Sequence, residues 1–133
     1  MTRVGLMPII FFIVLIFLVS SIPSFHAPGP RFLLKDKLAH FSEYFILGLL
    51  LFRSFRWDVS RSRVATFGFL LAIGATIGAV DEVYQSFIPG RKMDIDDWYA
   101  DVLGVAFAVG LFAFTAFGKW PGTFHDTGSR EAV

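Results

Sequence analysis

Apolar residues fill four long runs of this chain, and short polar stretches separate them. The runs lie near residues 4–22, 38–55, 64–88 and 96–118. A helix needs about 20 residues to cross a hydrocarbon core of about 30 Å, and each run is close to that length. The pattern therefore predicts an all-α fold, an integral membrane bundle of four transmembrane helices within residues 1–120. Residues 121–133 are polar and predict a short, disordered cytoplasmic tail.

The first run, from Val4 to Ile22, follows a lone Arg3 and would also suit a signal peptide. We favour an uncleaved span, because the run exceeds the usual apolar length of about 7 to 15 residues and matches a small-x-small cleavage site poorly. Prolines 23, 28 and 30 then predict an extended connector before the second helix. We expect the first helix to act as an anchor and packing element.

Composition agrees with a membrane protein. Of the 133 residues, 55% are hydrophobic and 17 are Phe, and the mean hydropathy is +0.63. A soluble domain of this size could not bury so much apolar surface. The net charge of +1, with Lys and Arg in short interhelical clusters, argues against a nucleic-acid partner. Because the chain has no Cys, it has no thiolate metal site and no thiol nucleophile.

The loop cations predict an orientation. The densest cluster of arginines lies between Arg53 and Arg63, and the positive-inside rule places that loop in the cytoplasm. Both termini are then cytoplasmic. The start of the second helix, the end of the third and the start of the fourth meet at the extracytoplasmic face.

Polar residues gather at this predicted face. An ionisable side chain inside a spanning helix costs roughly 2.5 to 3.5 kcal/mol on insertion scales, so it is normally paired, turned inward or part of a site. Lys37, His40 and Tyr44 share one helix face by their i, i+3 and i+4 spacing. Asp97 and Asp101 share another face with Gly104. The sequence therefore predicts a polar pocket between the second, third and fourth helices.

Small residues predict where helices approach closely, since packing and not hydrophobicity drives association within a bilayer. On the third helix these are Gly68, Gly74 and Gly78. On the fourth they are Gly104 and Ala108.

The candidate catalytic residues are His40, Glu43, Asp81 and Glu82. Histidine titrates near neutral pH, and a carboxylate can orient it for acid and base work. The alternative is structural: His40 hydrogen-bonds a neighbouring helix, and the carboxylates belong to a buried ion-pair network.

A second set of residues is predicted to bind a ligand. Arg91 could hold a phosphate or carboxylate bidentately, aided by N–H groups at the start of the fourth helix. The alternative for Arg91 is a salt bridge to Asp94 or Asp97 that fixes the loop. Asp97 and Asp101 could also join His40, Glu43, Asp81 or Glu82 around a divalent metal, since carboxylate-rich sites suit Mg²⁺, Ca²⁺ or Mn²⁺. No compact ligand motif is present, so metal and cofactor stay undetermined. The set comprises Lys37, Tyr44, Gln85, Arg91, Asp94, Asp97 and Asp101.

Two blocks of these residues resemble the VanZ-like family over about residues 35 to 110. The first is Lys37-x-x-His40-Phe41-x-x-Tyr44 with Gly48, and the second is Asp81-Glu82-x-x-Gln85, Pro89-Gly90-Arg91-x-x-Asp94-x-x-Asp97-x-x-x-Asp101-x-x-Gly104. The resemblance implies a small multi-pass protein of the bacterial inner membrane, of the type named for teicoplanin resistance. One position departs from the pattern, because the family often has Asn where this chain has Asp101.

The resemblance implies a membrane protein that binds or modifies a cell-envelope component, such as an anionic lipid headgroup or a peptidoglycan precursor, at its extracytoplasmic pocket. Two alternatives stay open. One is a membrane-embedded hydrolase or transferase that uses His40 and the carboxylates. The other is a non-catalytic scaffold whose charges lock the bundle. An ion or proton pathway is disfavoured, because the stretches from Phe45 to Phe52 and from Phe67 to Ala75 are apolar.

Overall fold

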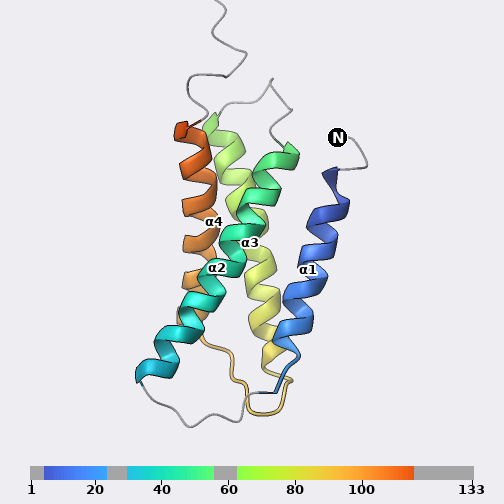
Figure 1. Ribbon diagram of the computed structural model, residues 1–133, viewed down its shortest axis with the longest axis vertical. Coiled ribbons are helices and arrows are strands. Elements are labelled where there is room, and N and C mark those ends of the chain that lie inside the picture. Colours follow the sequence, from blue (N-terminus) through green and yellow to red (C-terminus); the bar gives the residue numbers. More distant parts are fainter. Residues whose placement is uncertain (1–4, 24–29, 56–62, 116–133) are drawn as a thin grey trace, which may run out of the picture.

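The computed structural model of the chain describes residues 5–23, 30–55 and 63–115. These residues form four α-helices and no strand, which confirms the all-α prediction. The helices run alternately up and down, so the ends of α1 and α3 meet the starts of α2 and α4 at one end of the bundle (Figure 1). Their bounds are α1 Met7–Ser20, α2 Pro30–Phe55, α3 Arg63–Gln85 and α4 Ile95–Thr115.

The observed bounds differ most from the predicted ones at the start of α2 and at the end of α3. α2 begins at Pro30, so assigning this proline to an extended connector was wrong. The fixed φ of proline suits the first turn of a helix, where its missing N–H would have no partner. α3 ends at Gln85 and not near residue 88, and the chain then turns through Gly90, whose φ is 78°. The predicted tail at 121–133 lies outside the described residues.

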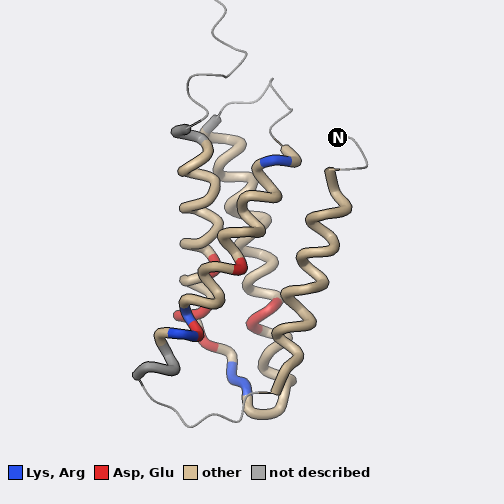
Figure 2. Tube along the Cα trace, in the orientation of Figure 1, with Lys and Arg blue, Asp and Glu red and all other residues tan. Residues whose placement is uncertain are grey.

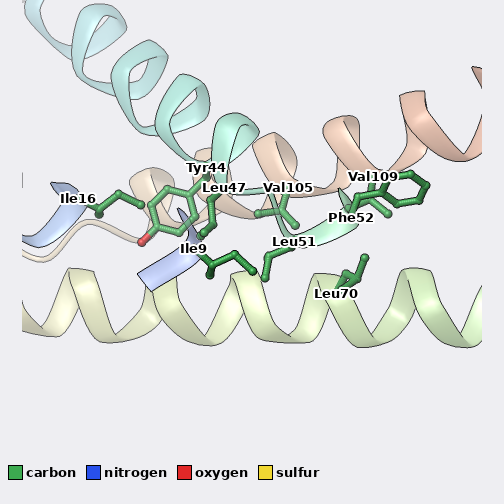
Figure 3. Packing of buried hydrophobic residues seen from close by; sticks show 9 residues of the cluster. All are labelled: Ile9, Ile16, Tyr44, Leu47, Leu51, Phe52, Leu70, Val105 and Val109. Atoms are coloured by element: carbon green, nitrogen blue, oxygen red, sulfur yellow. The ribbon is translucent and has the colours of Figure 1, made fainter. Parts of the chain in front are cut away.

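An apolar core runs along the bundle axis and receives side chains from all four helices. Figure 3 shows these side chains gathered between the helices, with Ile16 and the hydroxyl of Tyr44 at one end of the row. The buried cluster consists of Ile9, Ile16, Tyr44, Leu47, Leu51, Phe52, Leu70, Val105 and Val109.

The close approach of α2 and α4 depends on glycine. A Cβ at Gly104 would lie 2.5 Å from the carbonyl oxygen of Phe41 and 2.9 Å from the backbone nitrogen of Phe45. A Cβ at Gly48 would lie 2.8 Å from the Cβ of Ala108. These distances leave no room for a side chain, so the two backbones touch here. This contact sets the register between the polar residues of α2 and those of α4.

The glycines of α3 divide into two kinds. At Gly74 a Cβ would lie 2.6 Å from Val105 Cγ2, and at Gly78 it would lie 2.9 Å from Asp101 Oδ2. The predicted close packing is therefore confirmed for both. It was wrong for Gly68, where a Cβ would meet nothing within 4 Å.

Length and composition single out two of the described helices as candidate membrane spans, Leu34–Phe55 and Val64–Gln85. α1 is apolar, but its 14 residues fall short of the roughly 20 that cross a bilayer. α4 has 21 residues but carries Asp96, Asp97 and Asp101 in its first turns. Together with the predominantly apolar composition, the two spans indicate a membrane protein.

Charged residues of the described chain are distributed unevenly along the bundle. Asp and Glu gather in the half where α3 ends and α4 begins, as Figure 2 shows in red. The opposite half is almost free of charge apart from Arg53 near the end of α2. The acidic residues of the described chain thus lie in one half of the bundle.

Candidate functional site

The centre of the polar half is a buried cluster of one histidine and two carboxylates, each from a different helix. His40 of α2, Glu82 of α3 and Asp101 of α4 are 4%, 2% and 0% exposed. Nδ1 of His40 lies 3.0 Å from Oδ1 of Asp101 and 3.9 Å from Oε1 of Glu82. The sequence predicted a pocket, but these three side chains lie inside the bundle and not on an open surface.

Glu82 also connects the end of α3 to the start of α4. Its Oε2 accepts a hydrogen bond of 2.9 Å from the backbone N–H of Asp94. Its other oxygen, Oε1, is the one near His40. A single carboxylate therefore fixes the connecting loop and faces the cluster at the same time.

A second polar group surrounds Gln85 near the end of α3. The side-chain nitrogen of Gln85 donates to Oδ2 of Asp81 at 3.1 Å and to Oγ of Ser20 at 3.3 Å. Its oxygen accepts from Nη1 of Arg91 at 2.9 Å. Since Ser20 is the last residue of α1, this helix does more than anchor and pack: it supplies a polar contact to the site.

The Arg91 guanidinium is held by neutral oxygens. Besides Gln85, it contacts the carbonyl oxygen of Ile22, to which Nε donates at 3.1 Å. Within the described residues no carboxylate lies within ion-pair distance of Arg91, so the alternative of a salt bridge to Asp94 or Asp97 is ruled out, and ligand binding by Arg91 stays a prediction. Arg91 is partly exposed and keeps N–H groups that none of these contacts uses.

Lys37, and not Arg91, pairs with the two carboxylates of the salt-bridge alternative, Asp94 and Asp97. Its Nζ lies 2.9 Å from Oδ1 of Asp97, 3.5 Å from Oδ2 of Asp94 and 4.0 Å from Oδ2 of Asp96. The ammonium group is therefore paired with the start of α4. This pairing joins α2 to α4 beside the contact of His40 with Asp101.

Asp94 caps α4 and so limits what else can bind there. Its Oδ1 accepts from the backbone N–H of Asp96 at 2.9 Å, and its carbonyl oxygen accepts from the N–H groups of Asp97 and Trp98 at 3.2 and 3.3 Å. A side-chain oxygen before the first turn satisfies N–H groups that a helix start leaves free. These N–H groups are thus engaged within the protein. Contrary to the prediction, they are not available to assist the binding of an external anion.

Two predicted site residues stand apart from these pairs. Glu43 is half-buried on α2, and within the described residues it makes no hydrogen bond or ion pair. Tyr44 is fully buried as a member of the apolar core cluster. The structure therefore places His40 with Glu82 and Asp101, and it leaves Glu43 outside that contact.

The polar half of the bundle holds more buried hydrogen-bond acceptors than donors. Buried polar atoms in proteins nearly always have a partner, and a missing partner costs about 1 to 3 kcal/mol. Four buried oxygens in the described structure have none: Tyr44 Oη, Asp81 Oδ1, Glu82 Oε1 and Asp101 Oδ2. Three of the four are carboxylate oxygens, so the site suits a proton, a cation or another donor.

Two sets of side chains bring enough ligand atoms together to hold a metal ion. In the first, His40, Glu82 and Asp101 each offer an atom within 4.8 Å of the others. In the second, His40 is joined by Asp36 and Asp97. The sets share His40, so the choice between them depends on which carboxylates are free.

Some residues of the site escaped the sequence analysis. Ser20 is a small polar residue at the end of the first apolar run. This position in the sequence could have indicated that Ser20 lies at the same level of the bundle as Asp81. Trp98 donates from its indole nitrogen to the carbonyl oxygen of Ala75 at 2.9 Å and so ties α4 to α3. No local pattern pointed to that contact, because it depends on how the two helices pack.

A match to one known protein family extends over the whole described bundle. The sequence profile of the VanZ/LLP1 family matches residues 6–116, which include all four helices and every residue of the cluster. A fission yeast (Schizosaccharomyces pombe) protein described as uncharacterized is 37% identical over 98 residues, 74% of this chain and 57% of that protein. This chain thus spans little more than half the length of that relative, which is not bacterial. No solved structure matches the chain significantly. On the extent of the profile match, the chain belongs to the VanZ/LLP1 family.

Proposed function

We propose that this protein is a four-span membrane protein that binds the anionic headgroup of a cell-envelope component at the polar end of its bundle, through Arg91. The proposal rests on the contacts of the Arg91 guanidinium. It is held by Gln85 and Ile22, yet it has no carboxylate partner within the described residues.

The four-span part of the proposal rests on the direction of the α4 side chains. Asp97 and Asp101 lower the mean hydropathy of this helix, but both are buried. Its outward face is apolar, with Leu103 and Phe107 60% and 59% exposed. Charge turned into a bundle does not meet lipid, so α4 is suited to a bilayer despite its composition.

α1 presents a similar outward surface. Ile10, Phe11 and Leu18 are all more than half exposed to the surroundings of the bundle. Large apolar side chains exposed along a whole helix mark an interaction with lipid or a partner. We therefore place α1 in the membrane beside α2 and α3.

The orientation follows from the cations at the opposite end of the bundle. Arg53 lies near the end of α2, away from the acidic residues (Figure 2). Arg56 and Arg61 continue this cluster in sequence, outside the described residues. By the positive-inside rule this end faces the cytoplasm, so the polar cluster and Arg91 face the other side.

Arg91 is suited to a phosphate or carboxylate because its planar fork can donate two parallel hydrogen bonds. The exposed Lys92 follows it in the same turn and adds positive charge. Lys37 differs, because its ammonium group is already surrounded by carboxylates. An anionic headgroup would therefore meet Arg91 first.

The proposal is tested by lipid binding to the purified full chain in a neutral detergent. The probes are short-chain phosphatidylglycerol, a short polyprenyl diphosphate and zwitterionic phosphatidylcholine. We expect Arg91→Lys to weaken anionic binding by about 1 to 3 kcal/mol, because the charge remains but the fork is lost. Arg91→Ala should abolish it. Preference for the phospholipid or for the diphosphate would distinguish a bulk headgroup from a wall precursor.

The matched control is Arg53→Ala, which removes a cation from the opposite end of the bundle. It should leave binding unchanged. Wild-type affinity in Arg91→Ala would contradict the proposal. So would a loss of binding that merely follows a loss of thermal stability, since this outcome favours a scaffold whose charges only lock the helices.

A further inference from the structure

The polar half of the bundle buries more negative charge than its neighbouring bases can balance. Asp81, Glu82 and Asp101 are each 2% exposed or less. Within the described residues, the base within ion-pair distance of Glu82 and Asp101 is His40. Asp81 is hydrogen-bonded by Gln85, which is neutral. Isolated buried carboxylates are strongly disfavoured, so these groups must be neutralised by protonation or by a further positive group.

The unpartnered oxygens show where that group would be placed. Oε1 of Glu82 and Oδ2 of Asp101 are buried and have no hydrogen-bond partner. Oε1 of Glu82 is also the atom that lies 3.9 Å from Nδ1 of His40. The free acceptors thus belong to the side chains that already surround His40.

The spacing of these atoms is close to that of ligands around one ion. Nitrogen and oxygen ligands lie about 2.0 to 2.2 Å from zinc, so neighbouring ligands are about 3.0 to 3.6 Å apart. Nδ1 of His40 is 3.0 Å from Asp101 and 3.9 Å from Glu82, and the three ligand atoms all lie within 4.8 Å. Small side-chain adjustments would bring them to one centre.

We propose that His40, Glu82 and Asp101 form a binding site for one divalent transition-metal ion between α2, α3 and α4. An imidazole with two carboxylates suits Zn²⁺, Mn²⁺ or Fe²⁺, whereas Mg²⁺ and Ca²⁺ prefer oxygen alone. Binding at Nδ1 replaces the proton shared with Asp101, so uptake of the metal releases a proton. The site goes beyond the binding of an anion by Arg91 and does not depend on it.

The competing set of Asp36, His40 and Asp97 is less suited. Oδ1 of Asp97 accepts from Lys37 at 2.9 Å, and this ammonium group would repel a metal ion. Asp36 is also only partly buried. Glu82 and Asp101, by contrast, each keep a free buried oxygen.

A surrounding contact holds one ligand of the proposed site in place. The backbone N–H of Asp94 fixes Oε2 of Glu82 and so leaves Oε1 directed to the cluster. Such outer contacts orient metal ligands and tune affinity.

The test uses the full chain, purified in detergent and stripped of metal with a chelator. Zn²⁺, Mn²⁺ and Co²⁺ are titrated against Mg²⁺ and Ca²⁺, and bound metal is counted by elemental analysis after dialysis. We expect one transition-metal ion for each chain and a higher melting temperature when it is bound. Co²⁺ should give visible absorption bands of a nitrogen and oxygen site. Binding should weaken as the pH falls.

Isosteric variants assign the ligands. Glu82→Gln and Asp101→Asn preserve size, and each should weaken metal binding by about 100-fold or more, beyond the loss seen when an outer contact is removed. Asp96→Asn, an exposed carboxylate at the start of α4, is the matched control and should bind as the wild type does. Arg91→Ala should also keep the metal, which separates this site from the anion site.

Two outcomes would overturn the inference. One is the absence of any stoichiometric transition metal on the folded wild-type chain. The other is a site that Asp36→Asn and Asp97→Asn remove while Glu82→Gln leaves it intact. The first outcome would leave protonation as the way in which the carboxylates are neutralised.

Discussion

The two halves of the bundle are held together in different ways. One half is filled by Leu51, Phe52, Leu70 and Val109, which are buried and need no hydrogen bonds. The other half buries His40 and several carboxylates, and some of their oxygens have no partner. In the apolar half, the packing of these side chains joins the helices without any charged group.

This difference indicates where function is to be sought. Charge inside a membrane bundle is costly and is commonly associated with a binding or transport role. Polar contacts between membrane helices contribute only about 0.6 kcal/mol on average, so a scaffold gains little from them. A cluster with unpaired acceptors gains even less. The unpaired acceptors of the polar half therefore support the proposed binding of a cation there.

The largest effect is expected when one member of the buried cluster is removed. His40→Leu should destabilise the metal-free protein by about 3 to 5 kcal/mol, because the carboxylates of Asp101 and Glu82 lose their neighbouring base. The double variant His40→Leu with Asp101→Leu should recover much of that loss. Thermal melting in detergent measures both effects.

The corresponding change in the apolar half is Leu70→Ala. It should cost about 2 to 5 kcal/mol through a cavity, while metal and lipid binding persist. If His40→Leu proved as stable as the wild type, the two halves would not differ in the way that we infer.

A smaller effect is expected at the backbone contact that sets the register between α2 and α4. Gly104→Ala places a Cβ against the backbone of Phe41 and Phe45, which cannot move as a side-chain tip can. We expect a loss of about 1 to 3 kcal/mol together with weaker metal binding, since α2 and α4 would separate.

Gly68→Ala is the matched control for that variant. A Cβ there meets nothing within 4 Å, and alanine favours helix by up to about 1 kcal/mol. The variant should therefore be neutral or stabilising. Equal losses at Gly68 and Gly104 would argue against a special contact between α2 and α4.

The smallest effect concerns the contact of α1 with the polar half. Ser20→Ala removes the hydroxyl that accepts from Gln85 at 3.3 Å, and we expect a loss of roughly 0.6 to 1 kcal/mol. Ser42→Ala is the control, because its exposed hydroxyl bonds only the carbonyl oxygen of its own helix at Leu38. A weaker affinity of Arg91 for anionic lipid in Ser20→Ala alone would show that α1 helps to position the Gln85 side chain.

Much of the local structure could be predicted from residue spacing. The i, i+3 and i+4 pattern placed Lys37, His40 and Tyr44 on one face, and in the structure the latter two are buried and Lys37 is half-buried. The same reasoning placed Asp97 and Asp101 on the inner face of α4, where both are buried. These predictions succeed because a helix repeats every 3.6 residues whatever surrounds it.

Predictions that depended on a partner in another element were less successful. A salt bridge from Arg91 to Asp94 or Asp97 was one of two alternatives for this arginine, but Lys37 pairs with both carboxylates. Lys37 is 57 and 60 residues away from them in sequence, so no local pattern could indicate the pairing. Gly68 and Gly74 likewise look alike in the sequence, yet only Gly74 faces another helix closely.

The sequence by itself determined the four apolar helices, the faces on which their polar residues lie, and the half of the bundle in which those residues gather. Periodicity and hydrophobicity are local properties, so they can be read along the chain. Only the tertiary structure decided that His40 meets Asp101 and Glu82, that Lys37 is paired, and that Arg91 is not. Those contacts depend on how α2 crosses α4. The backbone approach at Gly48 and Gly104 sets that crossing, and it brings together residues that lie far apart in the sequence.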